Sequence, residues 1–142
     1  MPLPLDEREA FLAEPRIGAL AVARAEAGRA PLTVPVWYWY EPGGTFWIMT
    51  GRDSAKAKAI RAAGRISLMT ERVEPTVRYV TVEGPVTSEV TSTVKELTEL
   101  AARYLPADKV EEYVKTATLE HGAQVTFHIR PEHWLSADLG SV

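Results

Sequence analysis

Two strand-like segments joined by a short turn constrain the fold of this chain most strongly. Residues 32–40 (LTVPVWYWY) and 45–50 (TFWIMT) are rich in β-branched and aromatic side chains, which favour strands. Residues 41–44 (EPGG) separate them, and a short Pro-Gly turn between two strands predicts an antiparallel hairpin. Parallel strands need long crossover connections, so these early strands argue against a doubly wound parallel sheet.

The rest of the chain predicts further strands and a few helices. We expect strands over residues 17–25, 66–70, 77–90, 124–129 and 134–137, and helices over 6–13, 54–63, 93–104 and 108–116. Thr93 and Glu96 have the spacing of a capping box, and Gly64 suits the position just after a helix. The predicted fold is therefore mainly β with a few helices, an antiparallel β-barrel in a single domain over residues 1–142.

The composition excludes several classes of protein. With 46% hydrophobic and 25% charged residues, the chain has the composition of an ordinary soluble globular protein. It contains no cysteine, which excludes disulfides and thiolate metal sites. No basic leader with an apolar run and no stretch of 18 apolar residues is present, so we expect a cytoplasmic protein without a membrane span. A net charge of −3 argues against general nucleic-acid binding.

A basic segment follows the second of the early strands. Residues 50–60 (TGRDSAKAKAI) leave that strand through a polar turn and enter an Ala-rich helix. The charged side chains between positions 52 and 65 are Arg52, Asp53, Lys56, Lys58, Arg61 and Arg65. Free N–H groups at a helix N-terminus, the helix dipole and lysine ammonium groups all attract anions. The segment predicts a site for a phosphate or polycarboxylate tail, and the alternative is a solvated helix face.

Other kinds of site lack their sequence patterns. The chain has no Gly-x-Gly-x-x-Gly after a strand, no Walker-type lysine loop and no Gly-x-Ser-x-Gly elbow. His121, His128 and His133 do not have the i, i+4 spacing of a zinc-binding helix. We therefore expect no metal site and interpret the histidines as surface or hydrogen-bonded side chains.

The aromatic run Trp37-Tyr38-Trp39-Tyr40 is the second notable segment. In a strand, alternate side chains point to opposite faces, which would place the two tryptophans on one face and the two tyrosines on the other. Both faces would then be covered. One would face the core, and the other would face a partner subunit or a stacked ligand.

Three segments in a fixed order resemble the split β-barrel flavin-binding proteins, the pyridoxamine 5′-phosphate oxidase-like superfamily. They are Pro35-Val36-Trp37, residues 50–58, and residues 78–84 (RYVTVEG). The second is similar to the strand–turn–Ser-x-Lys segment that holds the cofactor phosphate in that family, and the third to the strand beside the flavin. The resemblance covers residues 17–90. It implies a split barrel of the FMN-binding type and a homodimer with two cofactor sites between its subunits.

The resemblance also implies which residues bind the anionic part of the cofactor. Ser54, Lys56 and Lys58 would bind its phosphate. A groove lined by Arg52, Lys56, Lys58 and Arg61 would suit a longer anionic tail.

The remaining implied contacts are with the ring and its side chain. Thr50 and Gly51 would present their backbone to the ring or ribityl chain, and Val36 and Trp37 would flank the isoalloxazine. Tyr79 would approach the ring from the other subunit of the dimer.

Two departures from the family pattern reduce the range of cofactors and reactions that we expect. Ala55 stands where the oxidases usually have arginine, and residues 37–39 (WYW) stand where they have a basic residue. Residues 135–140 (LSADLG) do not form an Arg/His-rich segment that would hold pyridoxal phosphate, so we do not expect vitamin B6 oxidation. The chain more closely resembles small members that use FMN or the deazaflavin coenzyme (factor 420). We favour the deazaflavin, whose lactyl-oligoglutamate tail suits the basic groove.

The expected function is a flavin- or deazaflavin-dependent oxidoreductase that transfers a hydride between the cofactor and a small organic substrate. No proton donor is assigned, and Tyr38, Tyr40 and Tyr79 are the candidates. The alternatives are a non-catalytic carrier of flavin, deazaflavin or haem, and a purely structural dimeric barrel. A haem carrier would need one of the three histidines as an axial ligand.

Overall fold

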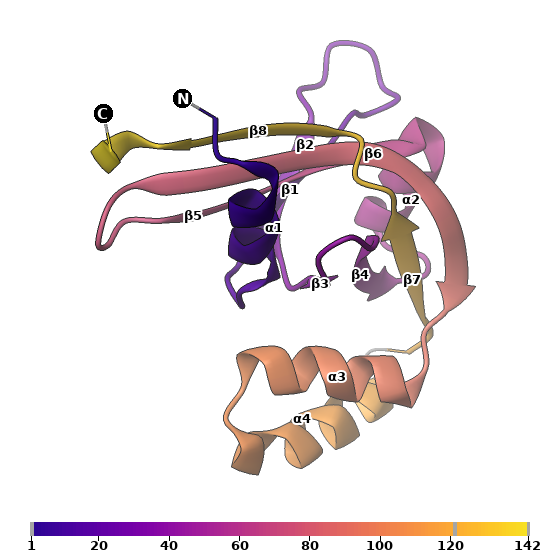
Figure 1. The fold of residues 1–142 in the computed structure, drawn as a ribbon. Coiled ribbons are helices and arrows are strands. Elements are labelled where there is room, and N and C mark those ends of the chain that lie inside the picture. The colour runs from indigo at the N-terminus through magenta and orange to yellow at the C-terminus, as the bar shows by residue number, and fades with distance from the viewer. Residues whose placement is uncertain (1, 121, 142) are drawn as a thin grey trace.

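A long curved strand, β6 (Arg78–Thr91), organises the structure (Figure 1). The computed structural model describes residues 2–120 and 122–141, so His121 lies outside the described residues. The other elements are α1 (Leu5–Ala13), β1 (Gly18–Val22), β2 (Leu32–Val36), β3 (Trp39–Tyr40), β4 (Phe46–Gly51), α2 (Ala55–Ala63), β5 (Arg65–Arg72), α3 (Val94–Tyr104), α4 (Ala107–Glu120), β7 (Gln124–Ile129), β8 (His133–Asp138) and a short 3-10 helix η1 (Leu139–Ser141).

The strands form one curled antiparallel sheet in the order β2-β1-β5-β6-β7-β4-β3, and β8 also pairs with β6. The first half of β6 pairs with β5 and β8, and its second half pairs with β7. The prediction of a mainly β, antiparallel fold with a few helices is confirmed, and the sheet curls into a half-barrel. None of the helices in the described ranges is long and apolar enough to cross a membrane.

Gly84 allows β6 to change partners. A Cβ atom at this position would collide with the carbonyl group of Arg130, in the connection between β7 and β8. That connection is held against β6 because Arg130 N donates to Pro85 O at 3.1 Å and Glu132 N donates to Glu83 O at 2.9 Å. Only glycine permits this close approach of two backbone segments.

The core lies inside the curl of the sheet. Its largest fully buried side chains include Tyr38, Phe46, Ile48, Ile60, Leu68, Phe127 and Ile129. Helix α2 packs on β1, β4 and β5 through Ala57 and Ile60, both of which are fully buried. The small alanines of α2 let the helix approach the sheet closely, as their spacing predicts.

The prediction of one continuous strand over residues 32–40 is wrong. β2 ends at Val36, where it pairs with Gly18 of β1, and β3 begins at Trp39, where it pairs with Trp47 of β4. Between them the chain passes from one part of the curled sheet to another. Tyr38 N and Tyr38 O form hydrogen bonds with the hydroxyl group of Tyr104, both at 3.1 Å, instead of with a neighbouring strand. The predicted hairpin with β4 therefore involves only the end of this segment.

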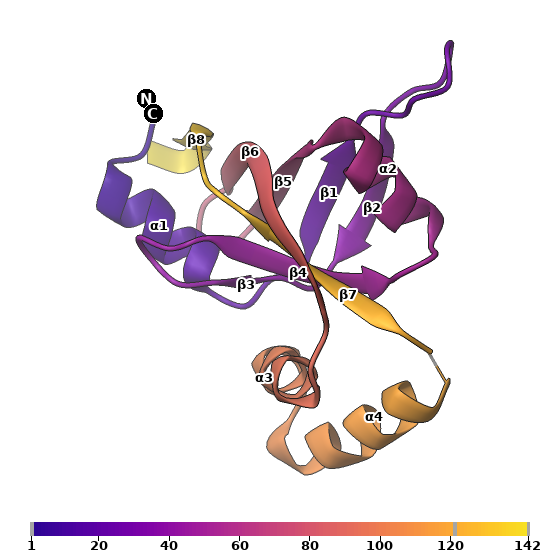
Figure 2. The ribbon, with the colours of Figure 1, turned by 90° about the vertical axis from the view of Figure 1, so that its right-hand side faces the viewer.

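Helices α1, α2 and α3 begin and end close to the predicted positions, whereas α4 ends at Glu120, one turn after its predicted end at residue 116. Ser54 caps α2 and Gly64 ends it with a φ of 71°. Thr93 and Glu96 form the predicted capping box at the start of α3. Helices α3 and α4 pack against each other as a pair at one end of the curled sheet (Figure 2).

Candidate functional site

The turn that enters α2 is held by side-chain hydrogen bonds. Ser54 Oγ accepts a hydrogen bond from Ala57 N at 3.0 Å, and Ser54 Oγ lies 3.1 Å from Thr50 Oγ1. Ser54 N donates to Gly51 O at 3.1 Å, which closes the turn after β4. When Thr50 is the donor of the hydroxyl pair, the hydroxyl hydrogen of Ser54 remains available to an anion. Thr50, Gly51 and Ser54 therefore lie together in one turn.

Lys56 lies in a pocket between the sheet and the α3–α4 pair. The pocket has a volume of about 170 Å3, and its walls are formed by Pro35, Val36, Trp37, Met49, Lys56, Leu97, Leu100, Tyr113 and Gln124. Lys56 is half-buried and forms no ion pair with a described residue. Burial lowers the pKa of Lys56 from its ordinary value of 10.5. A partly desolvated ammonium group that has no ion-pair partner among the described residues gains from an anionic ligand.

Trp37 forms the aromatic wall of this pocket. Its ring stacks on Tyr104 of α3, with centroids 5.0 Å apart and an angle of 14° between the planes. Its ring also meets Tyr113 of α4, at 5.3 Å and 41°. Trp39 stacks instead on Trp47 at 6.0 Å, so the two tryptophans have different partners. Both tyrosines of the run are buried, although only Tyr40 lies in a strand.

The α3–α4 pair is fixed to the sheet by Arg103 and Tyr104. Arg103 Nη1 donates to Ala13 O at 2.7 Å, and Arg103 Nη2 donates to Glu14 O at 3.0 Å, just where α1 ends. Tyr104 Oη lies 2.8 Å from Arg16 O and accepts from Tyr38 N at 3.1 Å. A cation at the C-terminus of α1 also interacts favourably with its dipole. These contacts hold Trp37 at the pocket.

The other basic residues of the segment do not join Lys56. Lys58 lies at a different pocket, because positions two apart in a helix point about 200° away from each other. Arg61 donates three hydrogen bonds to the carboxylate of Glu89 at 2.8–3.0 Å, and its Nη2 donates to Arg52 O at 2.8 Å. Hydrogen bonds from Arg61 lower the pKa of Glu89. The basic residues therefore do not line one groove as predicted, because Lys56 and Lys58 lie at different pockets and Arg61 is paired with Glu89.

The candidate proton donors Tyr38 and Tyr40 lie outside the pocket of Lys56. The Tyr38 hydroxyl donates to Leu12 O at 2.7 Å, and burial raises the pKa of Tyr38. Tyr40 lies at another hollow beside Trp134, and burial raises the pKa of Tyr40 to about 12. Both phenols therefore stay protonated over the neutral range.

The histidines within the described ranges are separate from one another and from these pockets. The His128 ring lies 6.3 Å from that of Trp47, and His133 Nε2 lies 3.4 Å from Glu132 Oε1 at an exposed position. No three histidine, aspartate or glutamate side chains gather as a metal site in the part of the chain that the structure describes.

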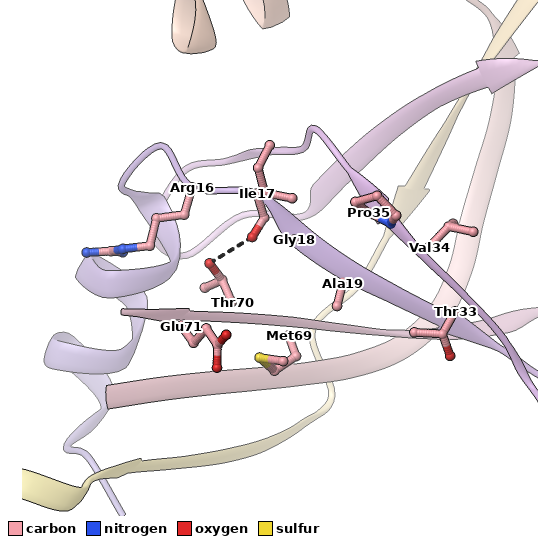
Figure 3. Close-up of a pocket in the computed structure, with 10 residues that line it drawn as sticks. All are labelled: Arg16, Ile17, Gly18, Ala19, Thr33, Val34, Pro35, Met69, Thr70 and Glu71. Carbon is pink, nitrogen blue, oxygen red and sulfur yellow. Dashed lines mark hydrogen bonds between the residues drawn. The ribbon is translucent and has the colours of Figure 1, made fainter. Parts of the chain in front are cut away.

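Tyr79 lies on the outer face of the sheet, away from the pocket of Lys56. The pairing register places Ala19, Met69, Thr81 and Leu135 in one row across β1, β5, β6 and β8. Tyr79 lies two positions from Thr81 and therefore on the same face. A hollow of about 480 Å3 opens on this face, where Figure 3 shows Ala19, Met69 and Pro35 around it. Pro35 also lines the pocket of Lys56, so β2 contributes to both hollows.

Comparison with known proteins identifies the family. The model of the pyridoxamine 5′-phosphate oxidase family matches residues 5–136, nearly the whole chain. The chain belongs to the pyridoxamine 5′-phosphate oxidase family. Comparison with curated proteins gives no match. The family match confirms the resemblance that the three sequence segments indicate.

Solved structures of other proteins are similar in fold. A protein named F420 reductase is 22% identical, with a TM-score of 0.70 over 89% of this chain and 94% of its own. A conserved hypothetical protein from Mycobacterium tuberculosis is 23% identical, with a TM-score of 0.74 over 96% of this chain and 85% of its own. An FAD-binding protein from Mesorhizobium loti is 21% identical, with a TM-score of 0.65 over 97% of this chain and 95% of its own.

The sequence does not predict the walls of the Lys56 pocket that come from outside residues 17–90. Leu97 and Leu100 of α3, Tyr113 of α4 and Gln124 of β7 all line the pocket of this family member. Helical spacing predicts that Leu97 and Leu100 share a face of α3, but it does not say what that face covers. Tyr113 carries no such signal, because a single tyrosine on a polar helix has no distinctive pattern.

Proposed function

We propose that this protein is a flavin- or deazaflavin-dependent oxidoreductase whose cofactor phosphate binds at Lys56. The observation that carries the proposal is the unpaired, half-buried ammonium of Lys56 in a pocket that Val36 and Trp37 also line. A phosphate group would give this ammonium a charge-assisted partner, and the Ser54 hydroxyl lies at the same turn. Three of the residues implied by family resemblance thus lie around one pocket.

The residues present fit an anionic cofactor with an apolar ring. When bound, the cofactor would supply the hydride chemistry. Lys56 and Ser54 would hold its phosphate, and the backbone of Thr50 and Gly51 borders the same turn. Trp37, stacked on Tyr104, would form a rigid wall that excludes water from one side of the ring.

A homodimer would complete this site. The outer face with Tyr79 exposes apolar side chains, since Ile17 is 53% exposed and Leu135 is 63% exposed. Ile17, Ala19 and Met69 line one hollow on this face, and an exposed apolar patch is typical of an interaction surface. We propose that a second copy covers this face and that Tyr79 of the partner subunit approaches the hollow there, which shares Pro35 with the Lys56 pocket.

We favour the deazaflavin over FMN as the cofactor. A protein similar in fold is named F420 reductase. Lys58 forms no ion pair with a described residue, which leaves one more cation near the start of α2 for a longer anionic tail. Arg61 contributes little to such a tail because Glu89 already neutralises its guanidinium group.

The test is a fluorescence titration of the protein with FMN and with the deazaflavin side by side, followed by a turnover assay. We expect saturable binding of at least one of them, with the deazaflavin tighter. The protein with its reduced cofactor should then be mixed with quinone, enone and nitro acceptors, and we expect at least one to reoxidise the cofactor faster than the free cofactor reacts. Binding without reoxidation by any acceptor would favour a carrier, and binding of neither cofactor would overturn the proposal.

A further inference from the structure

The pocket of Lys56 contains the one side-chain carboxamide of the chain. Gln124 is the only glutamine in the sequence, and there is no asparagine. Gln124 begins β7, and the next side chain, Val125, is buried in the core. Because side chains alternate along a strand, the amide of Gln124 points to the outer face of the sheet, where α3 and α4 form the opposite wall of the pocket.

The amide of Gln124 and the hydroxyl of Tyr113 are both available to a ligand. Neither group forms a hydrogen bond with a described residue. Both side chains line the pocket and are partly exposed, and neither polar group is among the buried side-chain atoms that lack a partner, so a ligand in the pocket can reach them. The ring of Tyr113 is held against Trp37, with centroids 5.3 Å apart, which fixes the position of its hydroxyl.

The charges of the pocket favour an uncharged group beside these two side chains. Among the described residues that line it, Lys56 carries the only charge and none is acidic. A cationic ligand would therefore find no carboxylate in the wall. A second anionic group would have no cation of its own once the cofactor phosphate binds Lys56. An uncharged oxygen acceptor fits best, because the amide and the phenol both offer hydrogen-bond donors.

We propose that Gln124 and Tyr113 bind the carbonyl oxygen of the acceptor substrate, and that this substrate is an uncharged molecule with a conjugated carbonyl group, an enone or a quinone. The inference deepens the proposed function and rests on it, since the hydride comes from the reduced cofactor. A carbonyl oxygen has two lone pairs, so it can accept hydrogen bonds from the amide of Gln124 and from the phenol of Tyr113 at once.

Hydrogen bonds to this oxygen would also assist the reaction. Hydride transfer from the reduced cofactor to the β-carbon of an enone breaks the C=C π bond and moves an electron pair toward the carbonyl oxygen. Donors that already face this oxygen stabilise the charge that develops there. A proton from water at the α-carbon completes the saturated ketone, and the cofactor is left oxidised. Gln124 and Tyr113 keep their protons throughout.

The test follows the side-chain amide signals of Gln124 by NMR, since they are the only carboxamide signals that this sequence can give. 2-Cyclohexenone is titrated into the full chain without cofactor and, separately, with saturating FMN or deazaflavin. We expect the enone to shift the amide signals of Gln124 in the cofactor-free protein and in the loaded protein. Affinities of the variants are compared through the indole N–H signal of Trp37. Gln124→Met and Tyr113→Phe should each weaken binding about three- to tenfold, as expected for the loss of one neutral hydrogen bond.

Thr118→Val is the matched control. It also removes a hydroxyl from α4, but Thr118 does not line the pocket of Lys56, and its hydroxyl donates to Val114 O at 2.8 Å or less. It should change the affinity for the enone less than about twofold. The inference is wrong if the amide signals of Gln124 do not move in the cofactor-free protein, if Gln124→Met or Tyr113→Phe binds the enone as tightly as the wild type, or if Thr118→Val weakens binding as much as they do. Should Gln124→Met fail to fold, the amide shift in the wild type and Tyr113→Phe decide. Failure of the proposed function is a separate outcome, because it shows as a wild type that binds neither cofactor.

Discussion

At the scale of single residues, Lys56 and Lys58 have different surroundings although only one residue separates them. The family resemblance implies that both bind the cofactor phosphate, and both lie at the start of a helix. The structure places Lys56 at a pocket under the α3–α4 pair and Lys58 at another hollow, beside Arg24. Burial lowers the pKa of Lys56 from its ordinary value of 10.5.

The pKa of Lys56 predicts a pH dependence of stability. Between its lowered folded pKa and the ordinary value of 10.5, the unfolded chain holds a proton that the folded chain has released. The contribution of Lys56 to the free energy of unfolding of the cofactor-free protein should therefore rise with pH in that window. Affinity for the cofactor phosphate should fall over the same window, because binding needs the ammonium form.

Urea denaturation of the wild type and of Lys56→Met, in steps from about pH 8 to 10.5, measures the first effect. The difference between the two proteins isolates Lys56 from the other groups that titrate at alkaline pH. The explanation is wrong if both proteins show the same slope of stability against pH.

At the scale of elements, the α3–α4 pair depends on one hydroxyl group for much of its connection to the sheet. Tyr104 Oη lies between Arg16 O and the backbone of Tyr38, where the chain leaves β2. Removal of that hydroxyl would leave Tyr38 N without its partner in a partly buried position. The same side chain supports the ring of Trp37 at the pocket.

Tyr104→Phe should lower the free energy of unfolding by about 1–3 kcal/mol, the cost of an unsatisfied buried donor. Chemical denaturation measures this change. Tyr113→Phe is the matched control, because the Tyr113 hydroxyl forms no hydrogen bond with a described residue, and it should cost less than about 0.5 kcal/mol. Equal losses in the two variants would show that the Tyr104 hydroxyl does not hold the pair to the sheet.

The sequence predicts elements well where the signal is local. The cap at Ser54, the left-handed Gly64 and the capping box at Thr93 depend only on neighbouring residues, and each is present. The strand over residues 32–40 fails because its break is decided by Tyr104, which is distant in sequence. Only part of the pocket is predicted, for the same reason. Val36 and Lys56 lie in segments with local signals, whereas α3 and α4 reach the pocket only through tertiary packing.

At the scale of the whole molecule, the outer face of the sheet is the surface that a second copy would cover. Ala19, Met69, Thr81 and Leu135 form a row of small and apolar side chains across four strands. The neighbouring positions on these strands point into the core, where Leu20, Leu68 and Val82 are fully buried. The outer row points the opposite way, so the core of this chain does not cover it.

Leu135→Glu should convert the proposed dimer to a monomer, because two buried carboxylates would face an apolar surface. Light scattering after size-exclusion chromatography should give twice the chain mass of 15.7 kDa for the wild type and about that mass for the variant. Leu119→Glu, at an 80% exposed position in α4, is the control and should not change the mass. A wild type that is already monomeric would contradict the dimer.

The most direct test of the central claim compares Lys56→Ala with Lys58→Ala in titrations with FMN and with the deazaflavin. If the pocket of Lys56 holds the cofactor phosphate, Lys56→Ala should weaken binding by about 1–3 kcal/mol, the range for a charge-assisted contact. Lys58→Ala should weaken binding by less than about 1 kcal/mol, as expected for a solvent-exposed charge. Wild-type affinity for both cofactors in Lys56→Ala would contradict the assignment of the site.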